Sequence, residues 1–147
     1  MKAVVTRVTS ASVTIGGEVC GQIGRGFLVL LGVGPNDTEA QAARLADKVT
    51  GPRVFEDENE KMNRNLAAVG GGLLVVSQFT LYADTKSRRP GFTGAAKPDV
   101  AIPLYEAFLS ECARLGFPPQ HGRFGADMQV YSVNDGPVTI LLDTDLM

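Results

Sequence analysis

Hydrophobic and polar residues alternate along residues 3–15, AVVTRVTSASVTI, which is the pattern of a β-strand with two different faces. Val4 and Val8 fall on one face, and Arg7 falls on the other. Gly16-Gly17 then leads the chain into EVCGQI, and two glycines between strand-like runs are typical of a tight turn. The pattern therefore predicts a β-hairpin.

Two longer apolar runs lack this alternation. Residues 26–33, GFLVLLGV, are too few to span a membrane, so they predict a central strand that is buried on both faces. Residues 73–83, LLVVSQFTLYA, predict a second strongly apolar strand. Residues 54–72 are polar and rich in turn-forming residues, which predicts a loop or hairpin before that strand.

Two segments have helical spacing instead. In the first, Thr38 and Gln41 form a capping box, and Gly51-Pro52 stops a helix of about three turns. In the second, apolar residues recur on one face of residues 101–115, with Pro103 expected in the first helical turn, where proline is tolerated.

The last part of the chain predicts two further strands, Met128 to Val133 and Val138 to Leu142, with NDGP between them. Strand-rich ends and two helices between separated sheets favour an α+β fold over a strict βαβ alternation. We therefore expect a single β-rich domain over residues 1–147, with barrel-like antiparallel sheets and two main helices.

Composition adds limits to this picture. The chain of 147 residues is 44% hydrophobic and 20% charged, as in a globular protein with one core. No signal-peptide pattern or long apolar run occurs, so we expect a cytosolic protein with no membrane partner. Cys20 and Cys112 lie far apart and outside any zinc-like spacing, and we expect both as free thiols, with Cys112 on the buried face of a helix.

A net charge of −2 argues against nonspecific coating of nucleic acid, but one segment is strongly basic. Lys86, Arg88, Arg89 and Lys97 lie close together in the sequence, with Phe92 between them. Such a segment is either a loop that contacts phosphates or simply a solvated loop.

The usual catalytic constellations are absent from the sequence. The one histidine, His121, is isolated in a Pro- and Gly-rich segment, so it defines neither a catalytic triad nor a metal site. The glycine-rich segments match neither nucleotide-binding fingerprint, and the acidic run at 56–60 lacks the spacing of a calcium loop. We expect no metal and no cofactor.

The segment SQFT interrupts the second apolar strand with polar groups. On a continuing strand, Ser77 and Phe79 point one way and Gln78 and Thr80 the other, so neither face is wholly apolar. A buried hydroxyl or amide without a partner costs about 1 to 3 kcal/mol. These side chains either find partners within the protein or line an opening for a ligand.

Four motifs carry a resemblance to a known family. They are VVSQFTLYAD, RRPGF, GRFGADM and VNDGPVT, in this order. The chain resembles the D-aminoacyl-tRNA deacylases over nearly its whole length. The resemblance implies a homodimer with each active site completed at the subunit interface. It also implies hydrolysis of the ester that joins a D-amino acid, or glycine mischarged on alanine tRNA, to the 3′-terminal adenosine of tRNA.

The resemblance also implies roles for Ser77, Gln78, Phe79 and Thr80 as the catalytic segment. Backbone N–H groups around Phe79 and Thr80 would hold the ester carbonyl oxygen, and the substrate's 2′-hydroxyl would assist. Ser77 and Gln78 would secure the pocket or the terminal adenosine. A Thr80 nucleophile is the rival mechanism, and it needs an activating base that the sequence does not supply.

A second group is implied to bind the substrate and select its chirality. Gly136-Pro137 is expected to be a cis peptide that reaches into the partner's pocket, with Arg7 holding its orientation. Phe124 and Met128 complete the implied substrate site. Main-chain contact would exclude the side chain of an L-amino acid. Two other functions stay open, namely a small-molecule esterase and a non-catalytic module that binds the tRNA acceptor end.

Overall fold

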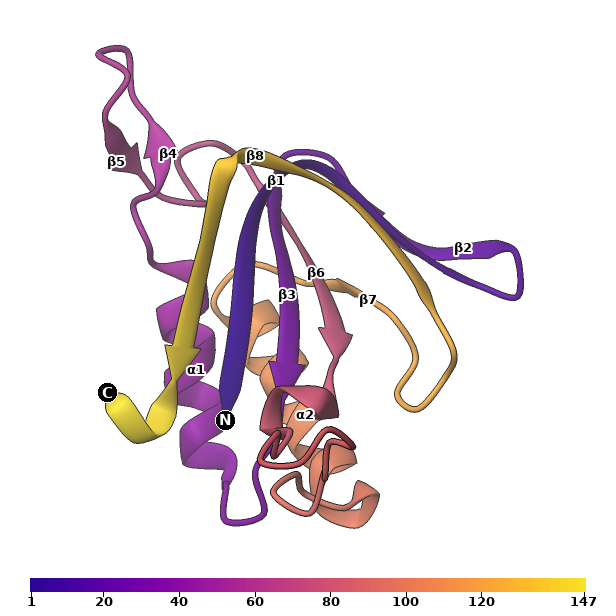
Figure 1. Ribbon diagram of the computed structural model, residues 1–147. Helices are drawn as coiled ribbons and strands as arrows, with labels where there is room; N and C mark the ends of the chain where they lie inside the picture. The colour runs from indigo at the N-terminus through magenta and orange to yellow at the C-terminus, as the bar shows by residue number, and fades with distance from the viewer.

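Six strands form one curved sheet, and two helices lie against one of its faces (Figure 1). The computed structural model describes residues 1–147. The sheet strands are β1 (Lys2–Ile15), β2 (Glu18–Ile23), β3 (Gly26–Gly32), β6 (Gly72–Ser77), β7 (Gln120–His121) and β8 (Gln129–Asp143). The other elements are the helices α1 (Glu39–Thr50) and α2 (Pro98–Arg114), the separate hairpin β4 (Phe55–Glu56) and β5 (Met62–Arg64), and the 3₁₀ turns η1 (Phe79–Tyr82) and η2 (Thr144–Leu146). The predicted α+β fold with two helices and a barrel-like sheet is confirmed.

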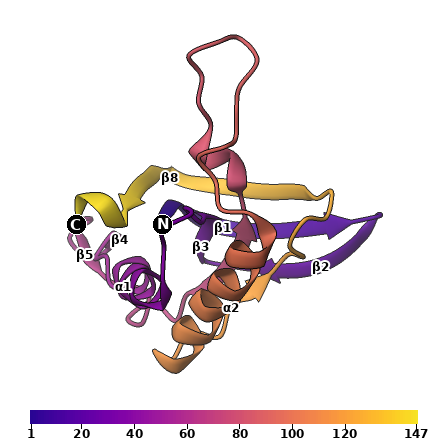
Figure 2. The same ribbon diagram turned by 90° about the horizontal axis from the view of Figure 1, so that it is seen from below.

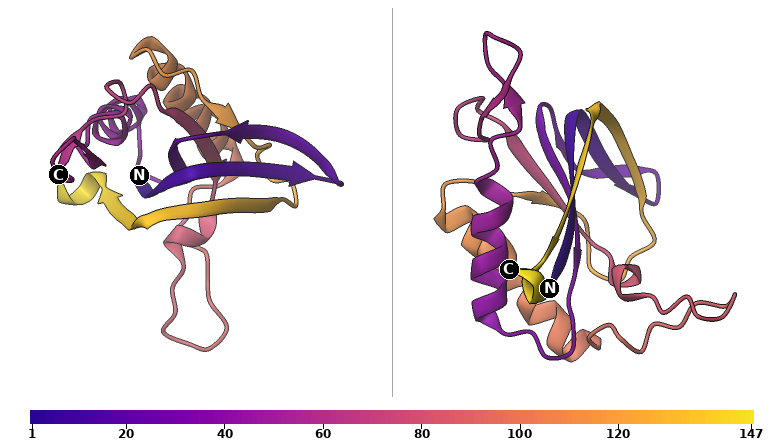
Figure 3. Two further views of the ribbon diagram at one scale, coloured as in Figure 1. Left: turned by 90° about the horizontal axis from the view of Figure 1, so that it is seen from above. Right: turned by 60° about the vertical axis from the view of Figure 1, so that its left-hand side comes forward.

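β1 is the strand around which the sheet bends. Its first half pairs antiparallel with β3, and its second half pairs antiparallel with β2, so the predicted hairpin is confirmed. β8 pairs antiparallel with β1 on the other side, almost from end to end. Because β1 changes partner from β3 to β2 midway, the sheet curls, and β8 follows the same curve (Figure 3).

The strands around β6 run parallel. β6 is parallel to β3, and β7 is parallel to β6. α1 with the β4–β5 hairpin connects β3 to β6, and α2 lies between β6 and β7, which are crossover connections of the kind that parallel strands need. The expected antiparallel pairing therefore holds around β1 but not around β6. The Pro- and Gly-rich sequence near His121 does not predict β7.

Alternate residues of β3 enter two different cores. Phe27, Val29 and Leu31 belong to the larger core, which both helices cover. Leu28 belongs to a smaller core inside the curl of the sheet, and Leu30 packs against it. Burying such a side chain contributes about 1.5 to 3 kcal/mol, so both faces of this strand stabilise the fold. The prediction of a strand buried on both faces is confirmed.

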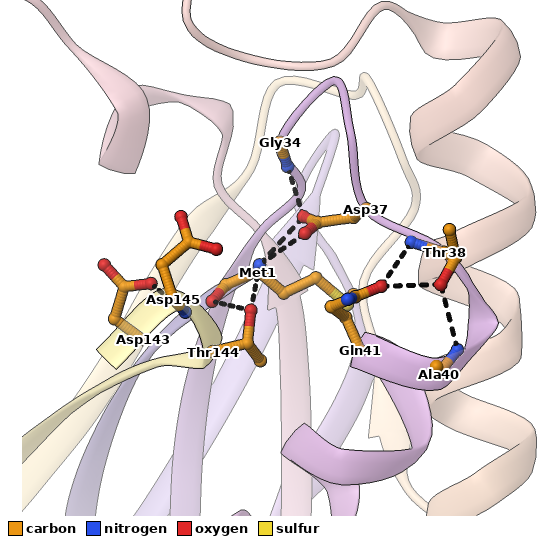
Figure 4. Close-up of polar contacts among 9 residues, drawn as sticks. All are labelled: Met1, Gly34, Asp37, Thr38, Ala40, Gln41, Asp143, Thr144 and Asp145. Carbon is orange, nitrogen blue, oxygen red and sulfur yellow. Dashed lines mark hydrogen bonds and ion pairs between the residues drawn. The ribbon is translucent and has the colours of Figure 1, made fainter. Parts of the chain in front are cut away.

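The first helix follows its sequence signals closely. The side-chain oxygen of Thr38 accepts a hydrogen bond from the Ala40 N–H, and Gln41 Oε1 accepts one from the Thr38 N–H at 2.7 Å (Figure 4). These bonds satisfy N–H groups that have no partner inside the helix. α1 ends at Thr50, directly before Gly51.

The second helix begins earlier than expected. α2 starts at Pro98, which places Pro103 in its second turn instead of its first. Pro103 cannot donate to the Asp99 carbonyl, but both residues are exposed, so water can satisfy that carbonyl. Cys112 is fully buried on the inner face of α2, as predicted, and both cysteines are free thiols.

The C-terminal segment forms one strand instead of two. β8 runs through Asn134 to Pro137 without a hairpin turn, and its pairing with β1 shifts register on both sides of Val8. Because β1 continues past it, the NDGP segment remains part of β8 and forms an irregularity in the strand pairing. No helix in the structure is both long enough and apolar enough to cross a membrane.

A buried charge ties the two ends of the chain to the start of α1. The α-ammonium group of Met1 forms an ion pair with Asp37 at 2.8 Å and donates a hydrogen bond to Thr144 Oγ1 at 2.7 Å (Figure 4). Asp37 also accepts a hydrogen bond from the Gly34 N–H at 2.6 Å. This cluster holds β1, η2 and the β3–α1 loop together.

Candidate active site

The SQFT segment is a turn at the end of a strand. β6 ends at Ser77, and the chain turns into η1, which begins at Phe79. The expected strand alternation through Thr80 is therefore wrong, and Phe79 and Thr80 are exposed while Ser77 and Gln78 are half-buried. The Gln78 amide donates a hydrogen bond to the Thr80 hydroxyl oxygen. The polar side chains thus stand at the surface, where a ligand can reach them.

Two backbone donors of this turn have no acceptor within the turn itself. The Gln78 N–H donates to the Leu31 carbonyl at 2.8 Å, and the Leu81 N–H donates to the Gln78 carbonyl at 3.3 Å. The N–H groups of Phe79 and Thr80, which lie between them, open the 3₁₀ turn η1 and have no acceptor within it. Adjacent free N–H groups can bind an oxygen that carries negative charge.

A long arm leaves the body of the protein directly after η1. Its base is closed by two backbone hydrogen bonds between Asp84 and Gly91, at 2.8 and 2.9 Å, and the loop between them projects away from both sheet and helices (Figure 2). The next residue, Phe92, packs edge-to-face on Phe79 with the ring centroids 5.1 Å apart. The arm is therefore physically joined to the SQFT turn.

The arm carries three of the four predicted cationic residues. Lys86, Arg88 and Arg89 are exposed on it, and Lys97 is the N-cap residue of α2. None of the four forms an ion pair within the chain. Their charges are available to an anionic partner.

Gly136-Pro137 lies at the other predicted site and is a cis peptide, as expected. Arg7, only 5% exposed, donates a hydrogen bond from Nε to the Asp135 carbonyl at 2.9 Å and one from Nη1 to the Val54 carbonyl at 2.6 Å. Its Nε atom also lies 3.5 Å from the Asp135 carboxylate. A buried guanidinium therefore holds the residue that precedes Gly136.

The SQFT turn and the Gly136-Pro137 segment do not meet within one chain. Arg7 pairs with Phe27 of β3, whereas Ser77 pairs with Leu31, four residues further along the same strand. Four residues correspond to about 13 Å along the strands, and β8 is three spacings of about 4.8 Å from β6 across the sheet. A site that uses both groups would have to draw them from two molecules.

An apolar groove of about 500 Å³ lies beside η1. Leu81 of η1 lines it together with Val4 of β1, two leucines of β8 and Leu146 of η2. Leu141 and Leu146 are 78% and 85% exposed, and together with the other apolar residues of the groove they form an exposed apolar patch. The apolar groove continues the surface on which the SQFT turn lies.

No tyrosine near the turn can act as a base. Burial, aided by the carboxylates of Asp37 and Asp143, raises the pKa of Tyr82 far above its usual value. Burial raises the pKa of Tyr105 to about 12, and its hydroxyl donates to the Val75 carbonyl at 3.3 Å. Both hydroxyls stay protonated near neutral pH. No group of three His, Cys, Asp or Glu residues is placed to bind a metal ion.

Comparison with known proteins identifies the family. Residues 4–143 match the family model of D-Tyr-tRNA(Tyr) deacylase. A D-aminoacyl-tRNA deacylase from Roseiflexus castenholzii is 59% identical over 98% of this chain and 92% of the relative. The chain belongs to the D-aminoacyl-tRNA deacylase family.

Two solved structures have a similar fold. A c-Myc DNA unwinding element binding protein has 44% sequence identity and a TM-score of 0.93, covering 98% of this chain and 99% of the other. A probable eukaryotic D-amino acid tRNA deacylase has a TM-score of 0.84 over 96% of this chain and 97% of the other, at 14% identity, which supports the fold alone.

In this member of the deacylase family, the remaining predicted residues are anchored in the cores. Phe124 is half-buried and packs on Tyr105 with the ring centroids 6.0 Å apart. Met128, also half-buried, packs against the smaller core. Both lie between β7 and the start of β8, and their roles in substrate binding stay predictions.

Sequence reasoning missed three groups around Gly136-Pro137 in this deacylase chain. The Asn134 side chain accepts a hydrogen bond from the Val138 N–H at 3.0 Å and donates one to Thr139 Oγ1 at 3.2 Å, closing the NDGPVT segment on itself. The NxGPVT motif contains this residue and could have indicated it. Asp135 and the Val54 carbonyl hold Arg7, and a backbone carbonyl leaves no signal in a sequence.

Proposed function

We propose that two copies of this chain form an enzyme that hydrolyses the ester bond of D-aminoacyl-tRNA. Membership of the D-aminoacyl-tRNA deacylase family carries the activity, so the chain is an ester hydrolase that acts on D-aminoacyl-tRNA. The observation that supports the site best is the pair of N–H groups at Phe79 and Thr80, which have no acceptor within their turn. The cytoplasm, where aminoacyl-tRNA is used, is the place of action that we propose.

The chemistry needs orientation and charge stabilisation more than a nucleophilic side chain. Water adds to the ester carbonyl carbon, and the two N–H groups donate to the oxygen that becomes negative. The bond between that carbon and the ribose oxygen then breaks, releasing a free D-amino acid and a tRNA with its 3′ hydroxyl restored. Removing one such donor in other enzymes costs about 10² to 10³ in rate.

Thr80 is a poor candidate for the nucleophile. Its hydroxyl oxygen accepts a hydrogen bond from the Gln78 amide, which is a donor and cannot remove the hydroxyl proton. No histidine, aspartate or glutamate is hydrogen-bonded to Thr80. We propose instead that the 2′-hydroxyl of the terminal adenosine assists the attacking water, with Ser77 and Gln78 securing the pocket.

The partner subunit supplies what one chain lacks. β8 pairs only with β1, so its other edge is open along a strand of fifteen residues, and long open edges invite another strand or copy. Tyr131 and Val133 are more than half exposed on this strand, and the apolar groove borders it. A two-fold dimer that buries this surface would bring Gly136-Pro137 of one chain to Ser77 and Thr80 of the other.

Chirality would be read by the main chain at Gly136-Pro137. Its carbonyl oxygens can accept hydrogen bonds from the ammonium group of the substrate, while Arg7 keeps the segment in place. An L-amino acid would then direct its side chain into this backbone, and a D-amino acid would direct it to solvent. Glycine, which has no side chain, would be accepted by the same filter. Phe124 and Met128 would line the rest of the site.

The basic arm would hold the tRNA. Lys86, Arg88 and Arg89 project from the body without internal ion pairs, and Lys97 lies near the base of the arm. Phosphate contacts position a nucleic acid and are independent of its sequence. This arrangement leaves the choice between D- and L-amino acids to the Gly136-Pro137 site.

One assay separates the proposed function from its alternatives. Purified protein is incubated with D-Tyr-tRNA, L-Tyr-tRNA and simple amino acid esters. Turnover of D-Tyr-tRNA alone is expected, turnover of the simple esters would indicate an esterase, and binding without turnover would indicate a binding module. Light scattering on the same sample tests the dimer: full activity at the mass of one chain, 15.6 kDa, would contradict it.

A further inference from the structure

Two aromatic rings stand exposed together at the foot of the basic arm. Phe79 is 54% exposed and Phe92 is 37% exposed, and the rings meet at an interplanar angle of 78°. Single exposed apolar side chains are ordinary, but neighbouring aromatic rings at a proposed site indicate a binding surface. Each ring leaves part of its surface uncovered by the rest of the chain.

Both rings have fixed positions. Phe79 is the first residue of η1, two positions after β6 ends at Ser77. Phe92 follows Gly91, whose backbone is hydrogen-bonded in both directions to Asp84. The ring pair is therefore held by backbone structure on both sides, and binding to it would cost little conformational freedom.

The charge around the rings favours a polyanion. Lys86, Arg88 and Arg89 lie on the arm that begins and ends beside them. The acidic residue of the arm's base, Asp84, already accepts a hydrogen bond from the Lys86 N–H at 2.9 Å. No carboxylate forms an ion pair with the three cations.

Exposed aromatic rings beside arginines are the surface that unpaired nucleotides bind. Bases in single strands stack on phenylalanine rings, whereas the bases of a duplex have no free face to offer. The proposed function places the ester carbonyl oxygen at the N–H groups of Phe79 and Thr80, so the terminal adenosine that carries the ester lies beside them. The unpaired nucleotides between this adenosine and the duplex stem are therefore within reach of the ring pair, which stands exposed beside the same turn.

We propose that the rings of Phe79 and Phe92 form a stacking platform for an unpaired nucleotide next to the terminal adenosine. This proposal rests on the proposed function for the placement of the RNA. Because only an unpaired base has a free face, the platform binds the single-stranded acceptor end, while the basic arm binds the phosphates beyond it.

The test measures binding of uncharged tRNA and needs no turnover. Fluorescence anisotropy is used to compare tRNA with its complete 3′ end against the same tRNA lacking its last three nucleotides. Base stacking on an aromatic ring is worth about 1 to 3 kcal/mol, so Phe92→Leu should weaken binding of the complete tRNA by about 5- to 150-fold. Phe92→Tyr keeps an aromatic ring and should bind within about twofold of the wild type.

The shortened tRNA is the control. It lacks the stacked nucleotide, so Phe92→Leu and the wild type should bind it equally. Equal binding of complete tRNA by Phe92→Leu and wild type would overturn the proposal, as would equal weakening toward both tRNAs. A change in the oligomeric mass of Phe92→Leu would also overturn it, because the rings would then belong to the subunit contact.

The two proposals can fail separately. Wild-type turnover of D-Tyr-tRNA without any stacking effect of Phe92→Leu overturns the platform alone. A ring-dependent preference for the complete 3′ end without turnover supports the platform and overturns the proposed hydrolysis.

Discussion

Replacing Gly136 by alanine should disable the enzyme while leaving it folded. Gly136 has a φ of +133°, a region that side chains disfavour. A β-carbon there would lie 2.8 Å from Val138 Cγ2, 3.0 Å from the Val138 nitrogen and 3.0 Å from Nη2 of Arg7. The new methyl group would therefore collide with Val138 and with the guanidinium group of Arg7, which holds this segment in place.

The magnitude follows from these contacts. A non-glycine residue at positive φ costs about 1 to 3 kcal/mol. Displacing the Arg7 side chain endangers its hydrogen bond to the Asp135 carbonyl, which, as a bond from a charged group, is worth about 1.5 to 3 kcal/mol. The two effects together lower the free energy of unfolding by about 2.5 to 6 kcal/mol, and each kcal/mol lowers Tm by about 2 to 4 °C.

Gly17→Ala is the matched control. Gly17 also has a positive φ, +83°, but a β-carbon there meets nothing within 4 Å, and it lies in the β1–β2 turn away from both predicted groups. It should lose only the backbone contribution and keep its deacylase activity. Because a displacement of about 1 Å in a positioning group can cost 10²-fold in rate, Gly136→Ala should lose about that much turnover of D-Tyr-tRNA.

The measurements are thermal unfolding and initial rates on D- and L-Tyr-tRNA at temperatures where both variants are folded. If Gly136→Ala keeps the wild-type rate and the wild-type preference for the D substrate, the proposed role of the segment is wrong. An equal loss of activity in Gly17→Ala would show that the effect comes from stability alone.

Three further outcomes are expected. Thr80→Ala should keep D-Tyr-tRNA turnover to within about 100-fold of the wild-type rate. A tRNA ending in 2′-deoxyadenosine should react more slowly still. A loss near 10⁶-fold in Thr80→Ala would instead identify Thr80 as the nucleophile. Replacing Arg88 and Arg89 by glutamate should raise KM for the tRNA substrate. It should also reduce the slope of log KM against log salt concentration by about one unit per lost phosphate contact. An unchanged slope would show that the arm is a solvated loop without phosphate contacts. Burial raises the pKa of Cys112 to about 12, so this thiol stays protonated at pH 8. A thiol reagent should therefore modify only the exposed Cys20 until the chain is unfolded. Two reactive thiols in the native protein would refute this prediction.

Signals that act between neighbours in the sequence were enough to predict most individual elements. The capping box of Thr38 and Gln41, the stop at Gly51 and the doubly buried strand at Phe27 to Leu31 all appear in the structure. Helix caps and side-chain periodicity depend on residues a few positions apart, so a sequence records them directly. The four motifs also indicated the family, which the comparisons confirm.

Pairing between distant segments decided the rest. A run of apolar residues followed by SQFT does not tell where the strand stops, because β6 ends at Ser77, the last residue that pairs with β3, one position before β3 itself ends at Gly32. The NDGP segment is a hairpin signal in isolation, yet β1 extends past it and keeps β8 a single strand. Long-range hydrogen bonding outweighs the local preference at such positions.

The site itself belongs to the tertiary structure. Arg7 was expected to hold Gly136-Pro137, but the Val54 carbonyl that anchors Arg7 from 47 positions away has no side-chain signal at all. The contact of Phe92 with Phe79 arises only because the Asp84–Gly91 backbone pair closes the arm between them. The separation of Ser77 from Gly136 within one chain likewise depends on sheet order and register, which residue types alone do not determine.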